Sequence, residues 1–529
     1  MLPDDILLEI FDFYVDVDLG DEDFAAFEKE ITEVWITLAH VCRRWRSVVF
    51  QSPSRLNLRF LCTPKTPARD ILDIWPPLPL IIRVQAEPSR VENITAALGY
   101  NERVCQIDLI DLTSPQWEYV MDSGAAYKPF PVLTHLRLNT YDRPGPILPD
   151  SFLGKTAPRL RSLDLVNITF PGLPKLLLSS THLVVLDLFD IPRSGYIPPE
   201  AMATTLPALT SLKFLRLHFR YPRPRPALES RRPCPPPLSR SILPGLTVFL
   251  FKGVSEYLEE ILARIDAPRL EELHITFFNQ IIFDTPQLFL FISRRPTLRA
   301  LEVGYIEFGS GAIIVKFPSQ ASDRGVLSVE IACTASEWQL SSLEQVCTSS
   351  LPTISALEDL HIFENREYPP HWQDDVENRL WLDLLRSFVA VKHLYLSEGF
   401  VPRIAPALQE LVGGRTMEVL PTLENISLEG LPPSRPLHEG IEKFVAARRL
   451  TSHPVEVFCS SEKATWRSRI GNYPSVSVSL TFLAISLPPP LSFLLSFALV
   501  FLNIMIPMMN TRRLFMRGWI DMTQLLIWH

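Results

Sequence analysis

One short pattern recurs along most of this chain: an apolar residue, two residues of any kind, an apolar residue, one residue of any kind and a third apolar residue. The last two apolar positions alternate with another residue, as a β-strand with one buried face requires. Ten such hexads begin at Val104, Leu133, Leu160, Leu183, Leu212, Leu270, Leu298, Leu357, Val391 and Leu423. A strand-forming unit that recurs in this way predicts a repetitive fold in which each unit packs against its neighbours.

The segments between the hexads favour helices. Residues 254–265 and 381–389 carry their apolar side chains with helical period. Proline stands two residues before the first apolar position of five hexads, where it ends a helix and releases the chain into an extended strand. These prolines are Pro131, Pro158, Pro268, Pro296 and Pro421. The longer gaps between hexads leave room for further units, such as LTVFLF from Leu246.

A strand followed by a helix in units of this length is the plan of the leucine-rich repeat. We therefore expect an α/β chain, a small helical module followed by an irregular leucine-rich-repeat solenoid with a parallel sheet. The regular repeat carries Asn or Cys at its ninth position, where only Asn365 matches here, so apolar packing is expected to hold the turns. An ordinary α/β domain with alternating strands and helices is the alternative.

The concave face of such a sheet supplies candidate contacts to a target protein. These candidates are Arg137, Asp164, Asp187, Arg216 and His274. Their mixed charge names no particular ligand. The histidines inside the hexads are interpreted as strand residues on the solvent face, not as catalytic bases.

The first fifty residues predict two amphipathic helices. Residues 2–14 place apolar side chains on one helical face, with Asp4 and Asp5 at the positive end of the helix dipole. A second helix is predicted from Ile31 to Phe50. The acidic stretch 16–33 between them predicts a solvated loop or fraying helix, because it lacks the ligand spacing and distal Glu of a calcium loop.

The run LPDDILLEIF, followed by WITLAHVCRRWRSVVFQSP, resembles the F-box. The opening Leu-Pro, the apolar helix and the later Leu-x-x-Val-Cys-Arg-x-Trp carry the resemblance. It implies a helical unit that docks on a Skp-type adaptor and, through it, on a cullin. The contact or core positions that it implies are Leu2, Pro3, Ile6, Leu7, Ile10, Phe11, Leu38, Val41, Cys42 and Trp45. Periodicity alone does not separate interface from core in this set.

The run RLNLRFLCTPKTPARDILDIWPPLPLIIRV resembles the segment after the F-box in a group of fungal F-box proteins, where a short helix containing Asp-x-Trp leads into a first strand, here about residues 80–84. We therefore divide the chain into an F-box at 1–60, a linker and first strand at 61–99, repeats at 100–440 and a tail at 441–529. Residues 220–240, rich in Pro and Arg, are predicted to form an inserted loop. A polyproline ligand for an SH3-like partner rests on composition alone.

The tail contains an apolar segment, 491–509, that is long enough to span a bilayer. The arginines that follow it favour a cytosolic C-terminus, which places the F-box on the side of the membrane where its partner is absent. A tail anchor and a poorly packed C-terminus both remain open. Without the anchor, the acidic N-terminus and scattered cysteines indicate a cytoplasmic or nuclear protein.

Sequence motifs of enzymes and metal sites are absent. The chain contains no phosphate loop, dinucleotide loop, zinc helix or nucleophile elbow, and its seven cysteines include no CxxC pair. The net charge of −8 gives no reason to expect nucleic acid binding. We therefore expect no cofactor, no metal and no catalytic residue.

Three functions follow from these patterns. The first is a substrate-recognition subunit of an SCF-type ubiquitin ligase, in which the repeats bind a target and the protein itself is not an enzyme. The second is a membrane-anchored leucine-rich-repeat interaction protein with a non-functional F-box. The third is an enzyme with an unrecognised site.

Overall fold

The structure is a computed structural model that describes residues 3–15, 38–52, 56, 58–74, 77–85, 91–221, 240–278, 283–299, 302–318, 326–333, 335–370, 372, 377–432, 436–451 and 453–460. All of them belong to one compact unit. The acidic stretch 16–33, most of the Pro/Arg-rich loop (222–239) and the apolar segment 491–509 lie outside the described residues.

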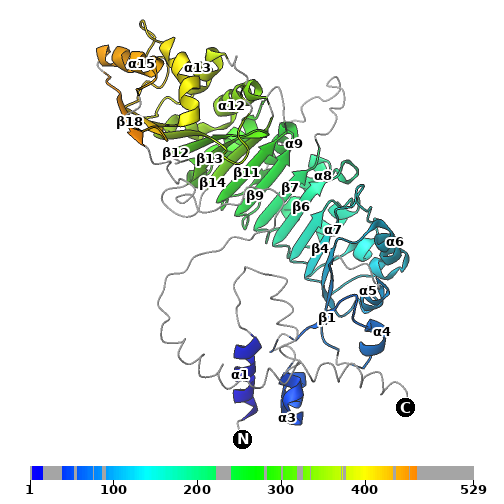
Figure 1. Ribbon diagram of the computed structural model, residues 1–529. Coiled ribbons are helices and arrows are strands. Elements are labelled where there is room, and N and C mark those ends of the chain that lie inside the picture. Colours follow the sequence, from blue (N-terminus) through cyan, green and yellow to red (C-terminus); the bar gives the residue numbers. More distant parts are fainter. Residues whose placement is uncertain are drawn as a thin grey trace, which may run out of the picture. The chain divides into compact units, whose positions relative to one another are not determined.

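A single sheet of sixteen strands organises the described part of the chain (Figure 1). Its strands, in spatial order, are β1 (Phe60–Cys62), β2 (Leu80–Gln85), β3 (Val104–Ile110), β4 (His135–Asn139), β5 (Ser162–Val166), β6 (Val185–Ile191), β7 (Phe214–Phe219), β9 (Val248–Gly253), β11 (Glu272–Phe277), β14 (Val326–Ala332), β13 (Ala312–Pro318), β12 (Val303–Phe308), β15 (Asp359–Glu364), β16 (His393–Ser397), β17 (Asn425–Glu429) and β18 (Glu456–Ser460). Neighbouring strands are parallel except at β13, which is antiparallel to both β12 and β14. A small second sheet pairs β8 (Ser241–Ile242) with β10 (Ile265–Asp266). The prediction of an α/β chain with a mostly parallel sheet is confirmed.

The hexads predict the strands closely. Eight of the ten hexads start two residues before the strand that they predict, and the hexad at Val104 starts with its strand. The additional unit at Leu246 forms β9. The strand predicted near residues 80–84 forms as β2, but it is not the first strand, because β1 precedes it and pairs with it in the same sheet. The fourth hexad position is fully buried in unit after unit, and its members lie in register across β4, β5, β6 and β7: Leu136, Leu163, Leu186 and Leu215.

The strand predicted at Leu298 is wrong. Pro296 begins a helical turn, α11 (Pro296–Arg299), in which Leu298 is fully buried, and the strand starts only at Val303. Proline fixes a φ angle that a first helical turn tolerates, so the same residue that ends a helix elsewhere starts one here. The following chain folds back as the β12–β13–β14 meander, which no hexad predicts.

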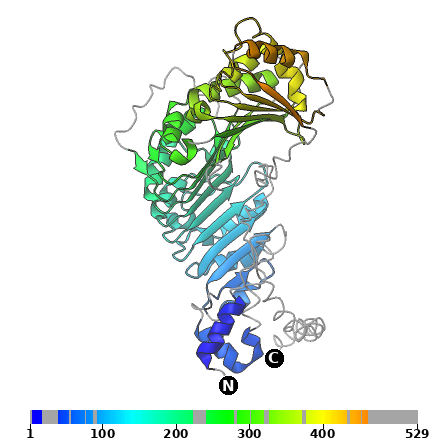
Figure 2. The ribbon, with the colours of Figure 1, turned by 90° about the vertical axis from the view of Figure 1, so that its left-hand side faces the viewer.

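Helices cover one face of the sheet, and Figures 1 and 2 show them along one side of the row of strands. They are α4 (Ala68–Ile71), α5 (Val91–Leu98), α6 (Ser114–Asp122), α7 (Leu173–Ser179), α8 (Pro199–Thr205), α9 (Ser255–Leu262), α10 (Pro286–Ser293), α12 (Ser336–Ser350), α13 (Asn378–Arg386), α14 (Val401–Gln409) and α15 (Glu439–Leu450). The helices predicted within 254–265 and 381–389 correspond to α9 and α13. Strand side chains alternate between buried and half-buried, so the sheet has a helix-covered face and an open face.

The turns are not held by apolar packing alone. Asn167, one residue past β5, has a positive φ of 58° and is buried. Its side-chain amide donates to the carbonyl oxygens of Thr140 (3.1 Å) and Asp142 (2.8 Å) in the neighbouring turn. The expectation that apolar packing holds the turns is therefore incomplete. Buried carbonyl groups without hydrogen bonds are costly, and here the Asn167 side chain supplies those bonds.

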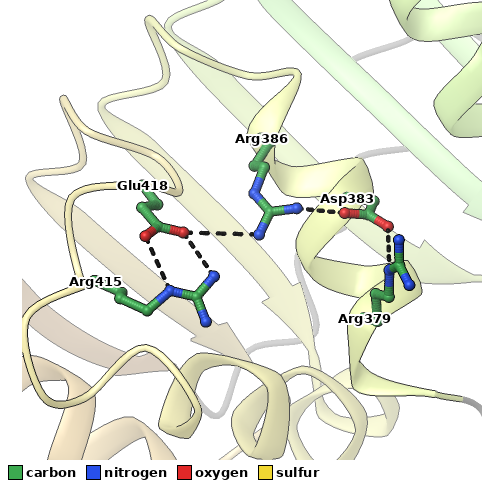
Figure 3. Close-up of polar contacts among 5 residues, drawn as sticks. All are labelled: Arg379, Asp383, Arg386, Arg415 and Glu418. Atoms are coloured by element: carbon green, nitrogen blue, oxygen red, sulfur yellow. Dashed lines mark hydrogen bonds and ion pairs between the residues drawn. The ribbon is translucent and has the colours of Figure 1, made fainter.

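An ion-pair network joins α13 to the turns after α14 (Figure 3). Asp383 contacts Arg379 at 3.5 Å and also pairs with Arg386, which approaches Glu418 at 3.7 Å. Glu418 in turn accepts two hydrogen bonds from Arg415, at 2.8 and 2.9 Å. These pairs are largely exposed, so we assign them a modest contribution to stability.

Candidate functional site

The N-terminal module is built on α1 (Asp4–Val15) and α3 (Arg43–Gln51), which pack against each other. Leu7, Leu8 and Phe11 form the buried side of α1. The Phe11 ring meets the Trp45 ring edge-on, with centroids 4.8 Å apart. Asp4 accepts two hydrogen bonds from Arg44, at 2.6 and 3.0 Å, and these bonds join the N-terminal ends of the two helices.

The single helix predicted from Ile31 to Phe50 is wrong in its described part. Residues 38–41 are helical, but Cys42 is extended, with φ −159° and ψ 169°, and α3 starts anew at Arg43. The Cys42 Sγ accepts a hydrogen bond from the Trp45 backbone N–H at 3.4 Å. Cys42 therefore acts as an N-cap, which satisfies an amide that the start of a helix leaves without a partner. Residues 31–37 lie outside the described residues.

The structure divides the predicted adaptor-binding residues into two groups. Leu7, Phe11 and Leu38 are buried and Trp45 is half-buried, whereas Leu2 lies outside the described residues. The exposed members are Pro3, Ile6, Ile10, Val41 and Cys42. Leu8 is also buried, although it was not among the predicted positions, because the stripe was drawn through its neighbours.

The exposed apolar side chains of this module are large. Ile6 and Ile10 are 46% and 45% exposed and lie one helical turn apart on α1, and Val41 is 56% exposed. A helix that already buries Leu7 and Phe11 does not need a second apolar stripe for its own stability. Ile6 and Ile10 are neighbours on the surface of α1, and adjacent exposed apolar side chains of this kind are typical of a protein–protein contact.

A second candidate surface follows one row of the open face, which we call the charged row. It consists of Arg83, Asp108, Arg137, Asp164, Asp187 and Arg216, each in register with the next on the adjacent strand. Ion pairs join Arg83 to Asp108 at 3.3 Å, Arg137 to Asp164 at 3.1 Å and Arg216 to Asp187 at 3.1 Å. The row is formally neutral, because three arginines face three aspartates.

Four of the five predicted target contacts therefore lie together, and His274 does not join them. Leu250 of β9 stands between Arg216 and His274 in the register, and His274 instead lies 3.6 Å from Glu272 on its own strand. Sequence reasoning missed Arg83 and Asp108. Asp108 occupies the fifth hexad position, as do the other members from Arg137 onward, so that position was the available signal.

The electrostatics of the charged row are unusual at one step, where Asp164 faces Asp187. Burial, and after it the negative charge of Asp187, raises the pKa of Asp164 to about 7 against the lowering effect of Arg137. Burial also raises the pKa of Asp187 and of Asp108. Two adjacent, poorly solvated carboxyl groups oppose each other's ionisation.

An aromatic row lies farther along the same face. Tyr305, His361 and Tyr395 are in register on β12, β15 and β16. Their rings stack with centroid distances of 4.7 and 4.0 Å. His361 and Tyr395 also occupy the fifth hexad position, but the sequence did not predict the stacking, because aromatic contacts between strands depend on the register.

The described residues contain no group of three or more His, Cys, Asp or Glu side chains placed to hold a metal ion. Their six cysteines are all free thiols.

Comparison with known proteins assigns the N-terminal module. Residues 1–54 match the family described as F-box-like. These residues form an F-box-like domain. No curated protein matches the chain significantly. Within the described ranges, no helix is both long enough and apolar enough to cross a membrane.

Proposed function

We propose that this protein is the substrate-recognition subunit of an SCF-type ubiquitin ligase. The F-box-like domain docks a Skp-type adaptor, and through it a cullin, in the cytoplasm or nucleus. The observation that carries the proposal is the exposure of Ile6, Ile10 and Val41 on a module that matches the F-box-like family. F-box proteins are generally non-catalytic adaptors, so this chain contributes proximity: it tethers a target close to the ubiquitin-transfer machinery.

We infer that the repeat region, 100–440, is an irregular leucine-rich-repeat solenoid whose open face binds the target. The regular spacing of strands and the placement of helices on one face support this inference. Strands β1, β2 and β18 continue the same sheet beyond both ends of that range. Arg137, Asp164, Asp187 and Arg216 are our proposed target contacts, and His274 is a separate proposed contact two strands away.

Co-purification of the full-length chain with a Skp-type adaptor tests the proposed function. Ile6→Asp places a charge on the exposed stripe of α1 and is expected to abolish adaptor capture without unfolding the protein. The matched control is Leu178→Asp on α7, which changes a side chain that is also about half exposed (50%) but lies in the repeat region. The proposal fails if Ile6→Asp retains the adaptor, or if both variants lose it equally.

A further inference from the structure

The step between β5 and β6 is the one place in the charged row where two like charges are adjacent. Neighbouring parallel strands lie about 4.8 Å apart, so Asp164 and Asp187 face each other closely. Their arginines stand on the outer sides, Arg137 on β4 and Arg216 on β7. Asp164 and Asp187 are direct register partners, so no arginine of the charged row lies between them. We call Asp164 and Asp187 the acidic doublet.

Each member of the acidic doublet uses one carboxylate oxygen for its arginine. The other oxygen, Oδ1 of Asp164 and Oδ1 of Asp187, is buried and has no hydrogen-bond partner. A buried carboxylate oxygen without a partner is costly, and a donor that reached both residues would remove that cost. The Oδ1 of Asp108 is likewise buried without a hydrogen-bond partner, but Asp108 has no acidic neighbour in the row, because arginines occupy both of its neighbouring register positions.

The surroundings of the doublet are apolar. Val166, Val185, Phe189 and Phe214 are half-buried on the open faces of β5, β6 and β7. The guanidinium of Arg216 lies 5.6 Å from the Phe189 ring centroid and 5.4 Å from that of Phe214. These rings and Asp187 hold Arg216 on the outer side of the doublet, from where its charge lowers the pKa of Asp164 less than burial and Asp187 raise it. Apolar surroundings also weaken solvent screening and strengthen any charge pair formed there.

From this arrangement we propose that the target protein presents an extended segment to the open face and inserts one lysine or arginine side chain between Asp164 and Asp187. Apolar side chains of the same segment pack on Val185, Phe189 and Phe214. The inference rests on the proposed function, since it assumes that the open face receives the target, and it names the chemistry that the target must supply. An acidic segment does not fit, because all three arginines of the charged row are already paired with aspartates of the same row.

The test measures binding of fluorescent peptides to the full-length protein by fluorescence anisotropy. The peptides are Ser-Thr-Val-Xaa-Val-Thr-Ser, with arginine, the uncharged isostere citrulline or glutamate at Xaa. We expect the arginine peptide to bind about tenfold or more tightly than the citrulline peptide, the size of effect that hydrogen bonds to a charged group produce. Asp164→Asn and Asp187→Asn are each expected to abolish this preference. Asp108→Asn, the matched control on β3, is expected to keep it.

Three results overturn the inference: equal binding of the arginine and citrulline peptides, a preference that survives both doublet substitutions, or no binding of the arginine peptide at millimolar concentration. The assay contains no adaptor, so its outcome is separate from that of adaptor capture. Loss of the peptide preference with intact adaptor capture refutes the acidic doublet alone. Loss of adaptor capture with an intact preference refutes the ligase assignment alone.

Discussion

Replacing Asp164 by asparagine is expected to stabilise the protein at alkaline pH. In the folded state the pKa of Asp164 rises from its ordinary value of 3.8 to about 7, chiefly through burial and the charge of Asp187. Each tenfold change in proton affinity corresponds to about 1.4 kcal/mol, so ionising this carboxyl group costs the folded state up to about 4 kcal/mol. Residual solvent contact of the side chain, 21% exposed, reduces that figure, and we expect about 1–3 kcal/mol.

The pH dependence gives the prediction its sign. Well below pH 3.8, the ordinary pKa, the carboxyl group is protonated in both folded and unfolded states, and the wild type carries no penalty from it. The free energy of unfolding of the wild type then falls as the pH rises toward 7, because the unfolded chain ionises Asp164 more readily. Asparagine resembles the protonated carboxyl group and does not ionise, so the variant lacks this loss.

Urea denaturation at pH 5 and pH 8 measures the effect. The advantage of Asp164→Asn over the wild type is expected to be larger at pH 8. The control is Asp122→Asn on α6, an exposed carboxylate, for which the difference from wild type should not change with pH. Two results refute the argument that ionisation of Asp164 in the acidic doublet destabilises the folded state. One is an equal gain in the free energy of unfolding at both pH values, and the other is a variant less stable than the wild type at pH 8.

Two further predictions concern the N-terminal module and the cysteines. Phe11→Ala removes a fully buried ring and is expected to lower the free energy of unfolding of the N-terminal module by about 3–5 kcal/mol. Ile6→Ala changes an exposed side chain and should alter that free energy by no more than about 0.5 kcal/mol. Limited proteolysis compares the two variants, and similar effects would contradict the division of α1 into core and contact surface. Iodoacetamide should modify the exposed Cys42 in the folded protein, but should modify Cys347 only after denaturation, because burial shields the Cys347 thiol and raises its pKa. Peptide mass spectrometry follows the labelling of both cysteines. Rapid labelling of Cys347 in the folded protein would disprove its burial.

Local sequence predicted the repeated part of the fold well. The hexads located their strands because the period of side chains along a strand is fixed by backbone geometry and is independent of distant residues. The failure at Leu298 has a physical reason: Pro296 is compatible with both the end of one helix and the first turn of another. The break at Cys42 was missed because the apolar stripe continues through it, while the cap depends on a local bond between Sγ and the Trp45 amide.

The sequence by itself determined which residues face away from the core, since alternation within a strand follows from the backbone alone. Only the tertiary structure decided which of those residues meet. Asp164 and Asp187 are 23 positions apart in the chain, and their juxtaposition depends on the register of β5 against β6. The separation of Ile6 and Ile10 from Leu7 and Phe11 likewise required the packing of α1 on α3, because a single amphipathic stripe contains both contact surface and core.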